Sequence, residues 1–253
     1  MKRLSMKKLS HSNLTLVLGL SIILLSLEVF SASKEKAKLK PFKGHETFDN
    51  LSEKRFIKFS KKNSEIKNGV LRTHGKSGSK YPPQVEIPID EMDCTISVRF
   101  RHLGEGNLLY LFIDGDDGFG GQDHMLRVRI NRNSVRVQVD NHTKDPKDPK
   151  LLKSIARTKK INPNKKERPA DSISGAYRVP EMLKPNMLDL KDAKWHELKL
   201  LFKKDTVSIS IDEKLWTKTL KRPGFAFKKD EILFMFDGGD KGIEIDDLKI
   251  ISN

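Results

Sequence analysis

The chain has 253 residues, of which 36% are hydrophobic and 33% are charged, so a folded core lies beneath a heavily charged surface. The formal net charge is +15, and the single cysteine, Cys94, excludes an intrachain disulfide. We expect a buried, inert thiol, because nothing around Cys94 predicts the electropositive pocket that a reactive thiolate needs.

The first 31 residues predict a secretory signal peptide. Basic residues precede an apolar run from Leu14 to Leu27, and small residues around Ser31 offer a cleavage site. This run is shorter than the about 20 residues that a membrane span needs, so cleavage is favoured over a retained N-terminal anchor. We therefore expect a secreted or periplasmic protein without a transmembrane span, with N-terminal membrane anchoring as the alternative. The lysine-rich residues 32–44 predict a basic linker.

Strands dominate the predicted domain, which spans residues 45–253. Asn68-Gly69 predicts a tight turn between two short strands. A nearly continuous apolar run at 108–113 predicts a central strand, and Lys203-Lys204-Asp205 predicts a turn between two strands. Alternation of apolar and polar residues predicts further strands at 96–103, 125–130, 134–140, 207–211, 231–239 and 242–252. The sequence therefore predicts an all-β fold, an antiparallel sandwich or barrel.

Residues 141–185 break this pattern. They contain six prolines and many lysines and arginines, and they predict a long basic loop with one short helical turn at "LLKSIA". A loop of this length is either functional or disordered.

Several short motifs resemble the concanavalin A-like lectin and glucanase domains of secreted bacterial proteins, near the 3-keto-disaccharide hydrolase and laminin G-like group. They are "TFD", "NGVL", "DHMLRVRI", "KWHELKLLFKKDTVSISID" and "GIEIDDLKI". The more specific parts are Trp195-His196 before a strand, Asp212 at the end of a hairpin, and the closing Ile-Asp-Asp. The resemblance covers residues 45–252 and implies a two-sheet antiparallel jelly-roll sandwich, often with a carbohydrate ligand.

Two features argue against carrying a glycosidase mechanism over. The Asn-Ser-Gly stretch of the hydrolase relatives is missing, because the corresponding region reads "RHLGEGNLLYLF". Retaining glucanases of this fold place three carboxylates on alternate residues of one strand, whereas here Glu244 and Asp246 are followed by Leu248. We assign no catalytic residue and expect this last strand to be a solvent-facing terminal strand.

The segment "DGDDGFGGQDHM" combines acids, glycines and a histidine between two predicted strands. Asp114 and Asp116 fit the start of a calcium loop, but Gly118 and Met125 occupy positions where an EF-hand needs ligands. We expect a glycine-rich strand connection at the ligand end of the sandwich. An irregular calcium site at Asp114 and Asp116 is one alternative, and ligand contact through Asp123 and His124 is another.

Arginine occupies polar positions of three predicted strands. If these strands are neighbours, their guanidinium groups form a stripe that matches the carboxylate or sulfate groups of an acidic glycan. The alternative is a solvated face on which arginine stems cover apolar surface. Trp216, flanked by lysines, is a candidate for stacking on sugar, whereas Trp195 is expected in the core. The arginines are Arg99, Arg101, Arg127, Arg129 and Arg136.

These observations predict a carbohydrate-binding or envelope-associated β-sandwich module without catalytic activity. A glycan-processing hydrolase related to the 3-keto-disaccharide hydrolases is one alternative, and a structural envelope protein without a glycan ligand is another. The expected partner is a polysaccharide or an anionic envelope component rather than nucleic acid. Calcium is the only cofactor that the sequence suggests.

Overall fold

A computed structural model gives the architecture of the chain from residue 40 onward. All described residues fall within one unit, Leu39–Asn253. The predicted leader and most of the predicted linker lie outside them. Within this part of the chain, no helix is both long enough and apolar enough to cross a membrane. The structure describes residues 40–49, 57–58, 64–73, 82–104, 107–115, 123–161, 163, 177–190, 193–237 and 241–253.

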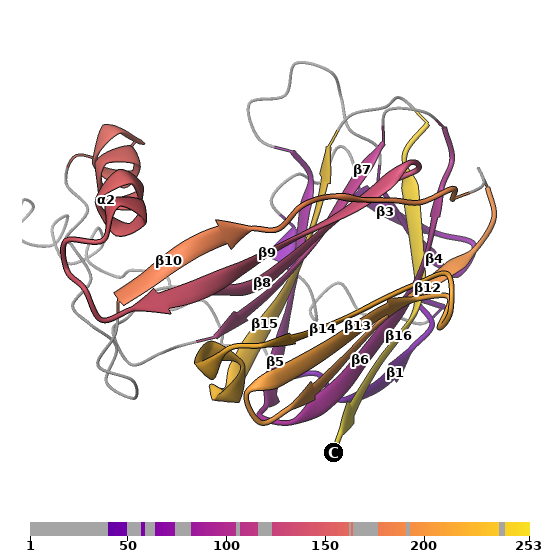
Figure 1. The fold of residues 1–253 in the computed structure, drawn as a ribbon. Coiled ribbons are helices and arrows are strands. Elements are labelled where there is room, and N and C mark those ends of the chain that lie inside the picture. Colours follow the sequence, from indigo (N-terminus) through magenta and orange to yellow (C-terminus); the bar gives the residue numbers. More distant parts are fainter. Residues whose placement is uncertain are drawn as a thin grey trace, which may run out of the picture. The chain divides into compact units, whose positions relative to one another are not determined.

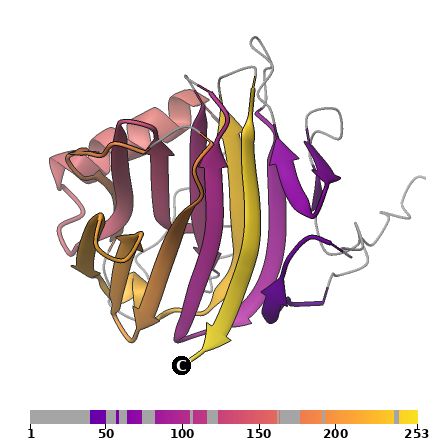
Figure 2. The same cartoon turned by 90° about the vertical axis from the view of Figure 1, so that its right-hand side faces the viewer.

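The strands form two antiparallel sheets that pack as a sandwich (Figures 1 and 2), which confirms the predicted jelly-roll architecture. Sheet A runs in the order β14 (Trp216–Lys221), β13 (Thr206–Ile211), β12 (His196–Lys203), β6 (Cys94–His102), β16 (Ile243–Ser252), β4 (Val70–Thr73) and β3 (Ser64–Lys67), with β1 (Gly44–Glu46) paired to β16. Sheet B runs in the order β10 (Tyr177–Met182), β9 (Ser134–Thr143), β8 (Asp123–Asn131), β7 (Leu108–Gly115), β15 (Lys229–Asp237), β5 (Gln84–Glu91) and β2 (Ile57–Lys58), with β11 (Asn186–Met187) paired to β9.

The core lies between the sheets and consists of every second residue of each strand. The predicted alternation is confirmed in β6, where Ile96, Val98 and Phe100 are all at most 1% exposed. In β7, the run of apolar residues is buried on both faces, as expected for a central strand between β8 and β15. Burying each such aliphatic or aromatic side chain contributes about 2 kcal/mol, so the core fixes which residues face outward.

Two tight hairpins set the register of sheet A. Asn68 and Gly69 both have positive φ, 53° and 73°, as a two-residue turn of type I′ requires, and they join β3 to β4 as predicted. Asp212 and Glu213 have φ of 48° and 52° at the β13–β14 connection. The Asp212 carboxylate accepts hydrogen bonds from the His196 ring and the Glu197 amide, which ties this turn to the start of β12.

Strand β16 differs from the solvent-facing terminal strand that the sequence predicts. It lies between β6 and β4, so both of its edges are paired. Its register shifts between Asp246 and Lys249, and Asp247 has a φ of 49°. This bulge turns Leu248 inward, where it is fully buried, instead of leaving it on the face that carries Glu244.

The predicted loop at 141–185 contains regular structure. Helix α2 spans Pro149–Ile161, and strands β10 and β11 follow it. The helix begins where Asp148 caps it, because the Asp148 carboxylate accepts hydrogen bonds from the amides of Lys150 and Leu151, with Pro149 in the first turn. The Lys150 amide thereby holds the pKa of Asp148 below its ordinary value. The expected helical turn at "LLKSIA" is thus part of a longer helix.

Lys229 is a lysine without exposed surface at the start of β15. Its ammonium donates hydrogen bonds to the carbonyls of Met92 and Phe225 and lies 4.7 Å from the centre of the Phe202 ring. Burial lowers the pKa of Lys229 from 10.5 to about 8. Burial also raises the pKa of the nearby Cys94 thiol to about 11, which agrees with the expected inert thiol.

Replacing Lys229 with methionine is predicted to flatten the pH dependence of stability in alkaline solution. Between about pH 8 and pH 10.5, the folded protein releases the Lys229 proton while the unfolded chain keeps it, so stability rises with pH. This rise amounts to about 3 kcal/mol at most. Urea unfolding across this range should show that Lys229→Met lacks it.

The matched control is Lys228→Met. Lys228 is exposed and pairs with Asp90, so its replacement should keep the alkaline rise. Parallel curves for the wild type and Lys229→Met would contradict the assignment of this titration to Lys229.

Candidate functional site

The five predicted arginines divide between the two sheets, so they do not form one stripe. Arg99 and Arg101 lie on β6 in sheet A, whereas Arg127, Arg129 and Arg136 lie on β8 and β9 in sheet B. The predicted stripe required all three strands to be neighbours, and only β8 and β9 are. The sequence shows which face of a strand each arginine occupies, but it does not show which distant strands pair.

The sheet A arginines are held by acids and by a tryptophan. Arg101 pairs with Glu244 at 2.5 Å, and Arg99 pairs with Asp247 at 3.0 Å. Their guanidinium carbons lie 4.5 Å and 4.9 Å from the centre of the Trp195 ring, within the range of cation–π attraction. Trp195 is therefore half-buried beneath two guanidinium groups on the outer face, not in the core as predicted.

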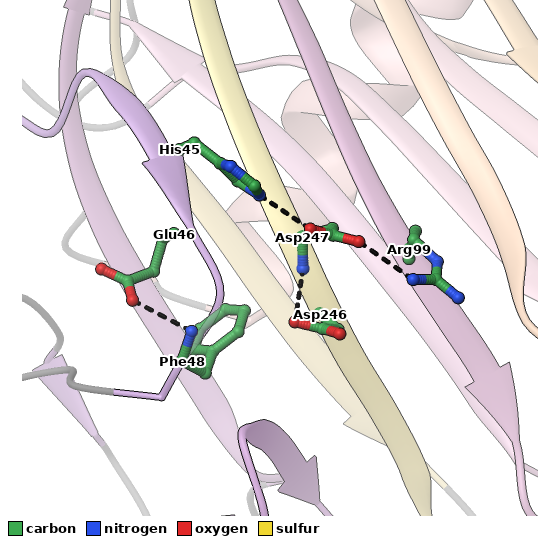
Figure 3. Close-up of polar contacts among 6 residues, drawn as sticks. All are labelled: His45, Glu46, Phe48, Arg99, Asp246 and Asp247. Atoms are coloured by element: carbon green, nitrogen blue, oxygen red, sulfur yellow. Dashed lines mark hydrogen bonds and ion pairs between the residues drawn. The ribbon is translucent and has the colours of Figure 1, made fainter.

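The same network continues to the N-terminal strand (Figure 3). The Nε2 atom of His45 on β1 lies 2.7 Å from Asp247 Oδ1. Beside it, the Glu46 carboxylate accepts a hydrogen bond from the Phe48 amide. Burial alone raises the pKa of Asp247, but hydrogen bonds from Arg99 and His45 outweigh it and lower this pKa. Burial raises the pKa of the adjacent Asp246. On sheet A, each arginine of the predicted set thus has a carboxylate partner, as expected for a structural network.

Trp216 does not lie on an outer face. It starts β14 opposite Ile211 and packs against the core as a half-buried side chain. The ring thus packs partly against the core, and the sugar-stacking role of Trp216 stays a prediction. The burial follows from the alternation of β14, in which Trp216 and Leu220 share the inner side.

The outer face of sheet B carries arginines over aromatic rings. The Arg127 guanidinium lies 4.5 Å from the centre of the Phe112 ring, and Arg129 lies 5.7 Å from that of Tyr110. The amide oxygen of Gln138 accepts a hydrogen bond from Arg127 at 3.2 Å. Burial, with the nearby charges of Arg129 and Arg157, lowers the pKa of Arg127. These arginines make no ion pair with another described residue.

Arg129 and Arg136 face each other directly across β8 and β9. Two like charges at such a position repel each other and destabilise the strand pair. The outer face of sheet B also carries acids, because Asp114 and Glu231 pair across β7 and β15 and Asp140 shares the outward side of β9 with Arg136. The repulsion between Arg129 and Arg136 is therefore local to β8 and β9.

His124 reaches this face because of a β-bulge. Ile113 pairs with Leu126, but Asp114 pairs with His124, so Met125 is the extra residue. Without the bulge, alternation would turn His124 inward with Leu126. Instead its Nδ1 contacts Asp114 Oδ1 at 2.8 Å, and its ring centre lies 4.5 Å from that of Phe112. Asp114 itself is fully buried.

The predicted acidic positions have a different arrangement from a metal loop. Asp114 holds His124, Asp116 lies outside the described residues, and Asp123 is described only as the residue that pairs with Gly115. Within the described part of the chain, no group of three acidic, histidine or cysteine side chains is placed to hold a metal ion. The calcium site stays a prediction.

Helix α2 lies next to β10 at the edge of sheet B (Figure 1). A pocket of about 620 Å³ is lined by residues of α2 and of strands β8, β9 and β10. Its lining is basic and contains no acid. The helix side of the pocket was not predicted from the sequence, although Lys150, Lys153 and Arg157 are spaced to share one face of a helix. The lining residues are His124, Arg127, Gln138, Lys150, Lys153, Ser154, Arg157, Val179, Pro180 and Met182.

Solved structures share this architecture at low sequence identity. LamAcat from Zobellia galactanivorans aligns over 86% of this chain and 100% of its own, with a TM-score of 0.54 and 10% identity. Porphyranase B from the same organism aligns over 82% and 91%, with a TM-score of 0.51 and 9% identity. A glycoside hydrolase family 16 endo-glucanase from Bacteroides ovatus aligns over 82% and 99%, with a TM-score of 0.50 and 12% identity.

The chain has a concanavalin A-like β-sandwich fold. These likenesses confirm the fold that the sequence motifs implied. No protein-family model and no curated protein sequence matches the chain. The narrower resemblance to the 3-keto-disaccharide hydrolase and laminin G-like group stays a prediction, and function has to be argued from the site.

Replacing Arg101 with methionine is predicted to destabilise the fold by about 2 kcal/mol, because it leaves the buried Glu244 carboxylate without its closest cation. Arg99→Met is the matched comparison. It should cost under about 1 kcal/mol, because Asp247 is more exposed and keeps His45. Urea unfolding measures both, and equal costs would contradict the account of the sheet A network.

Proposed function

We propose that the outer face of sheet B, together with helix α2, binds an acidic polysaccharide. The observation that carries the proposal is that every charged side chain in the lining of the pocket is basic, with Arg127 and the cations of α2 around a space of about 620 Å³. Carboxylate and sulfate groups fit guanidinium forks in geometry and in charge.

The charge balance supports an anionic ligand. Helix α2 carries five lysines and arginines and no acid, and it packs beside β10 next to the sheet B arginines. Lys150, Lys153 and Arg157 make no ion pair with another described residue. Bringing these cations together costs free energy, and a bound polyanion offsets that cost and releases counterions from the surface.

Apolar side chains in the lining support a sugar as the carrier of the charge. Val179, Pro180 and Met182 line the pocket beside its cations, whereas the Phe112 ring is buried beneath Arg127. Apolar surface with a few convergent polar groups is typical of ligand sites, and Gln138 adds an amide for hydroxyl groups. Two solved structures of the same fold, named as an endo-glucanase and a porphyranase, support the assignment of a glycan to this scaffold.

The predicted leader adds a location to the proposal. A secreted or periplasmic chain meets the acidic polysaccharides of envelopes and extracellular matrices, whereas nucleic acid is not its expected partner. Without residues 1–31, which carry a net charge of +3, the chain keeps about +12 of its +15, and this charge speeds the encounter with such polymers.

Binding of the full chain to acidic and neutral polysaccharides, measured by isothermal titration calorimetry, tests the proposal. We expect binding to acidic polymers only, weakened at roughly 0.5 M salt because screening then acts within a few ångströms. Arg127→Ala should weaken it about tenfold or more, since a charged hydrogen-bonding group is lost. Arg99→Ala on sheet A is the matched control and should bind like the wild type.

Equal loss in both arginine variants would mean that affinity follows net charge and not this pocket. Preference for a neutral polymer would contradict the proposal outright. Binding to nucleic acid with higher affinity than to any acidic glycan would replace the polysaccharide as partner.

A second prediction separates the two sides of helix α2. The double variant Lys153→Ala with Arg157→Ala removes two charges that line the pocket and should weaken binding about tenfold. The double variant Lys159→Ala with Lys160→Ala removes the same charge from the last turn of the helix, outside the lining. It should change affinity less than about twofold. Equal effects would contradict a defined site at the helix.

A further inference from the structure

We propose that the pocket is also catalytic: His124, held by the buried Asp114, is the general base for β-elimination in polysaccharides that contain uronic acids. This inference rests on the proposed function, because the substrate is an acidic polysaccharide bound between sheet B and α2. The binding site would then also catalyse a reaction, and the acidic group of the polysaccharide would be a uronate carboxylate.

The pair of His124 and Asp114 has the geometry of a general base that is oriented by a carboxylate. Asp114 is fully buried, and its Oδ1 lies 2.8 Å from His124 Nδ1. Its other oxygen, Oδ2, is buried and has no hydrogen-bond partner among the described residues. A buried carboxylate with so few partners is costly, and such costs persist at functional sites. Asp114 thus orients the ring and stabilises the imidazolium that forms when Nε2 takes a proton.

Two other His–Asp pairs between described residues differ in the partners of the carboxylate or in the exposure of the histidine ring. His45 contacts Asp247, but this carboxylate is shared with Arg99 on an open surface. His196 contacts Asp212, but its ring is only 3% exposed and its Nε2 is buried. The His124 side chain is 39% exposed and lines the pocket, so its Nε2 is the one that a ligand reaches.

Arg127 lies near His124 and is the cation that would bind the substrate carboxylate. The Arg127 guanidinium and the His124 ring each lie 4.5 Å from the centre of the same Phe112 ring, so they are at most twice that distance apart. A uronate carboxylate on Arg127 brings its C5 hydrogen, one carbon away, toward His124. The partly desolvated Arg127, fixed by Gln138, then stabilises the charge that develops on the carboxylate.

The proposed step is balanced without any further reactant. His124 Nε2 removes the C5 proton, and the electron pair moves into the carboxylate group beside Arg127. The pair then forms a C4=C5 double bond while the bond from C4 to the glycosidic oxygen breaks. The leaving oxygen receives the proton that His124 removed, so the products are an unsaturated uronate and a shortened chain.

The test follows the ultraviolet absorbance of the new double bond while the full chain acts on polymannuronate, polyguluronate and polygalacturonate. We expect absorbance to rise with at least one of them. His124→Gln should lower kcat about 100-fold or more, as the loss of a general base does, with the calorimetric Kd almost unchanged. His45→Gln removes a His–Asp pair that lies outside the pocket and should keep the full rate.

Asp114→Asn serves as the second variant and tests a positioning residue. Its amide still accepts the Nδ1 hydrogen bond but lacks the charge that stabilises the imidazolium, so kcat should fall while KM and the urea midpoint stay close to the wild type. Equal losses in KM and stability would assign Asp114 a structural role only.

The outcomes separate this inference from the proposed function. Binding of uronate polymers without any rise in absorbance would overturn the elimination and leave a binding module. New reducing ends without a double bond would identify hydrolysis and also overturn it. Failure to bind any acidic polymer would overturn both proposals.

Discussion

The packing of two β-sheets against one apolar core determines everything that the outer faces display. Because side chains alternate along a strand, burying Leu109, Leu111 and Ile113 of β7 forces Tyr110, Phe112 and Asp114 to the other side. The two rings beneath Arg127 and Arg129 are therefore placed there by core packing. A slip of one residue in register would exchange the two sets, at a cost of many kilocalories per mole in lost burial.

Much of this architecture was predictable, because strand alternation and turn chemistry are local properties. The strands β6, β7, β8, β9 and β13 and the Asn68-Gly69 hairpin follow directly from the sequence. The exceptions are two β-bulges, each of which inserts one residue that the alternation of apolar and polar residues does not reveal. One turns His124 outward to meet Asp114, and the other turns Leu248 inward, so the chemistry of both faces depends on features that alternation alone gets wrong.

The two arginine sets show why the candidate site was only half predictable. On sheet A, the strands bring Glu244 and Asp247 next to Arg101 and Arg99, although more than 140 residues separate the partners. On sheet B, the neighbours of Arg127 are aromatic rings and the basic helix α2. Identical residues on similar strands thus form a neutralised network on one sheet and, on the other, line the pocket that we propose as an anion site. Which distant strands pair cannot be read locally from the sequence. Proline-rich sequence also concealed α2, whose Asp148-Pro149 start resembles a turn.

One measurement tests the central claim, that the anion site lies on sheet B. An NMR titration of the full chain with an acidic oligosaccharide can follow the side-chain N–H signals of arginine together with the Trp195 indole signal. The account predicts that Arg127 shifts with saturation, whereas Arg99, Arg101 and Trp195, enclosed in the sheet A network, stay in place. Saturable shifts at Arg99, Arg101 and Trp195 with an unchanged Arg127 would contradict it and move the site to the opposite face of the sandwich.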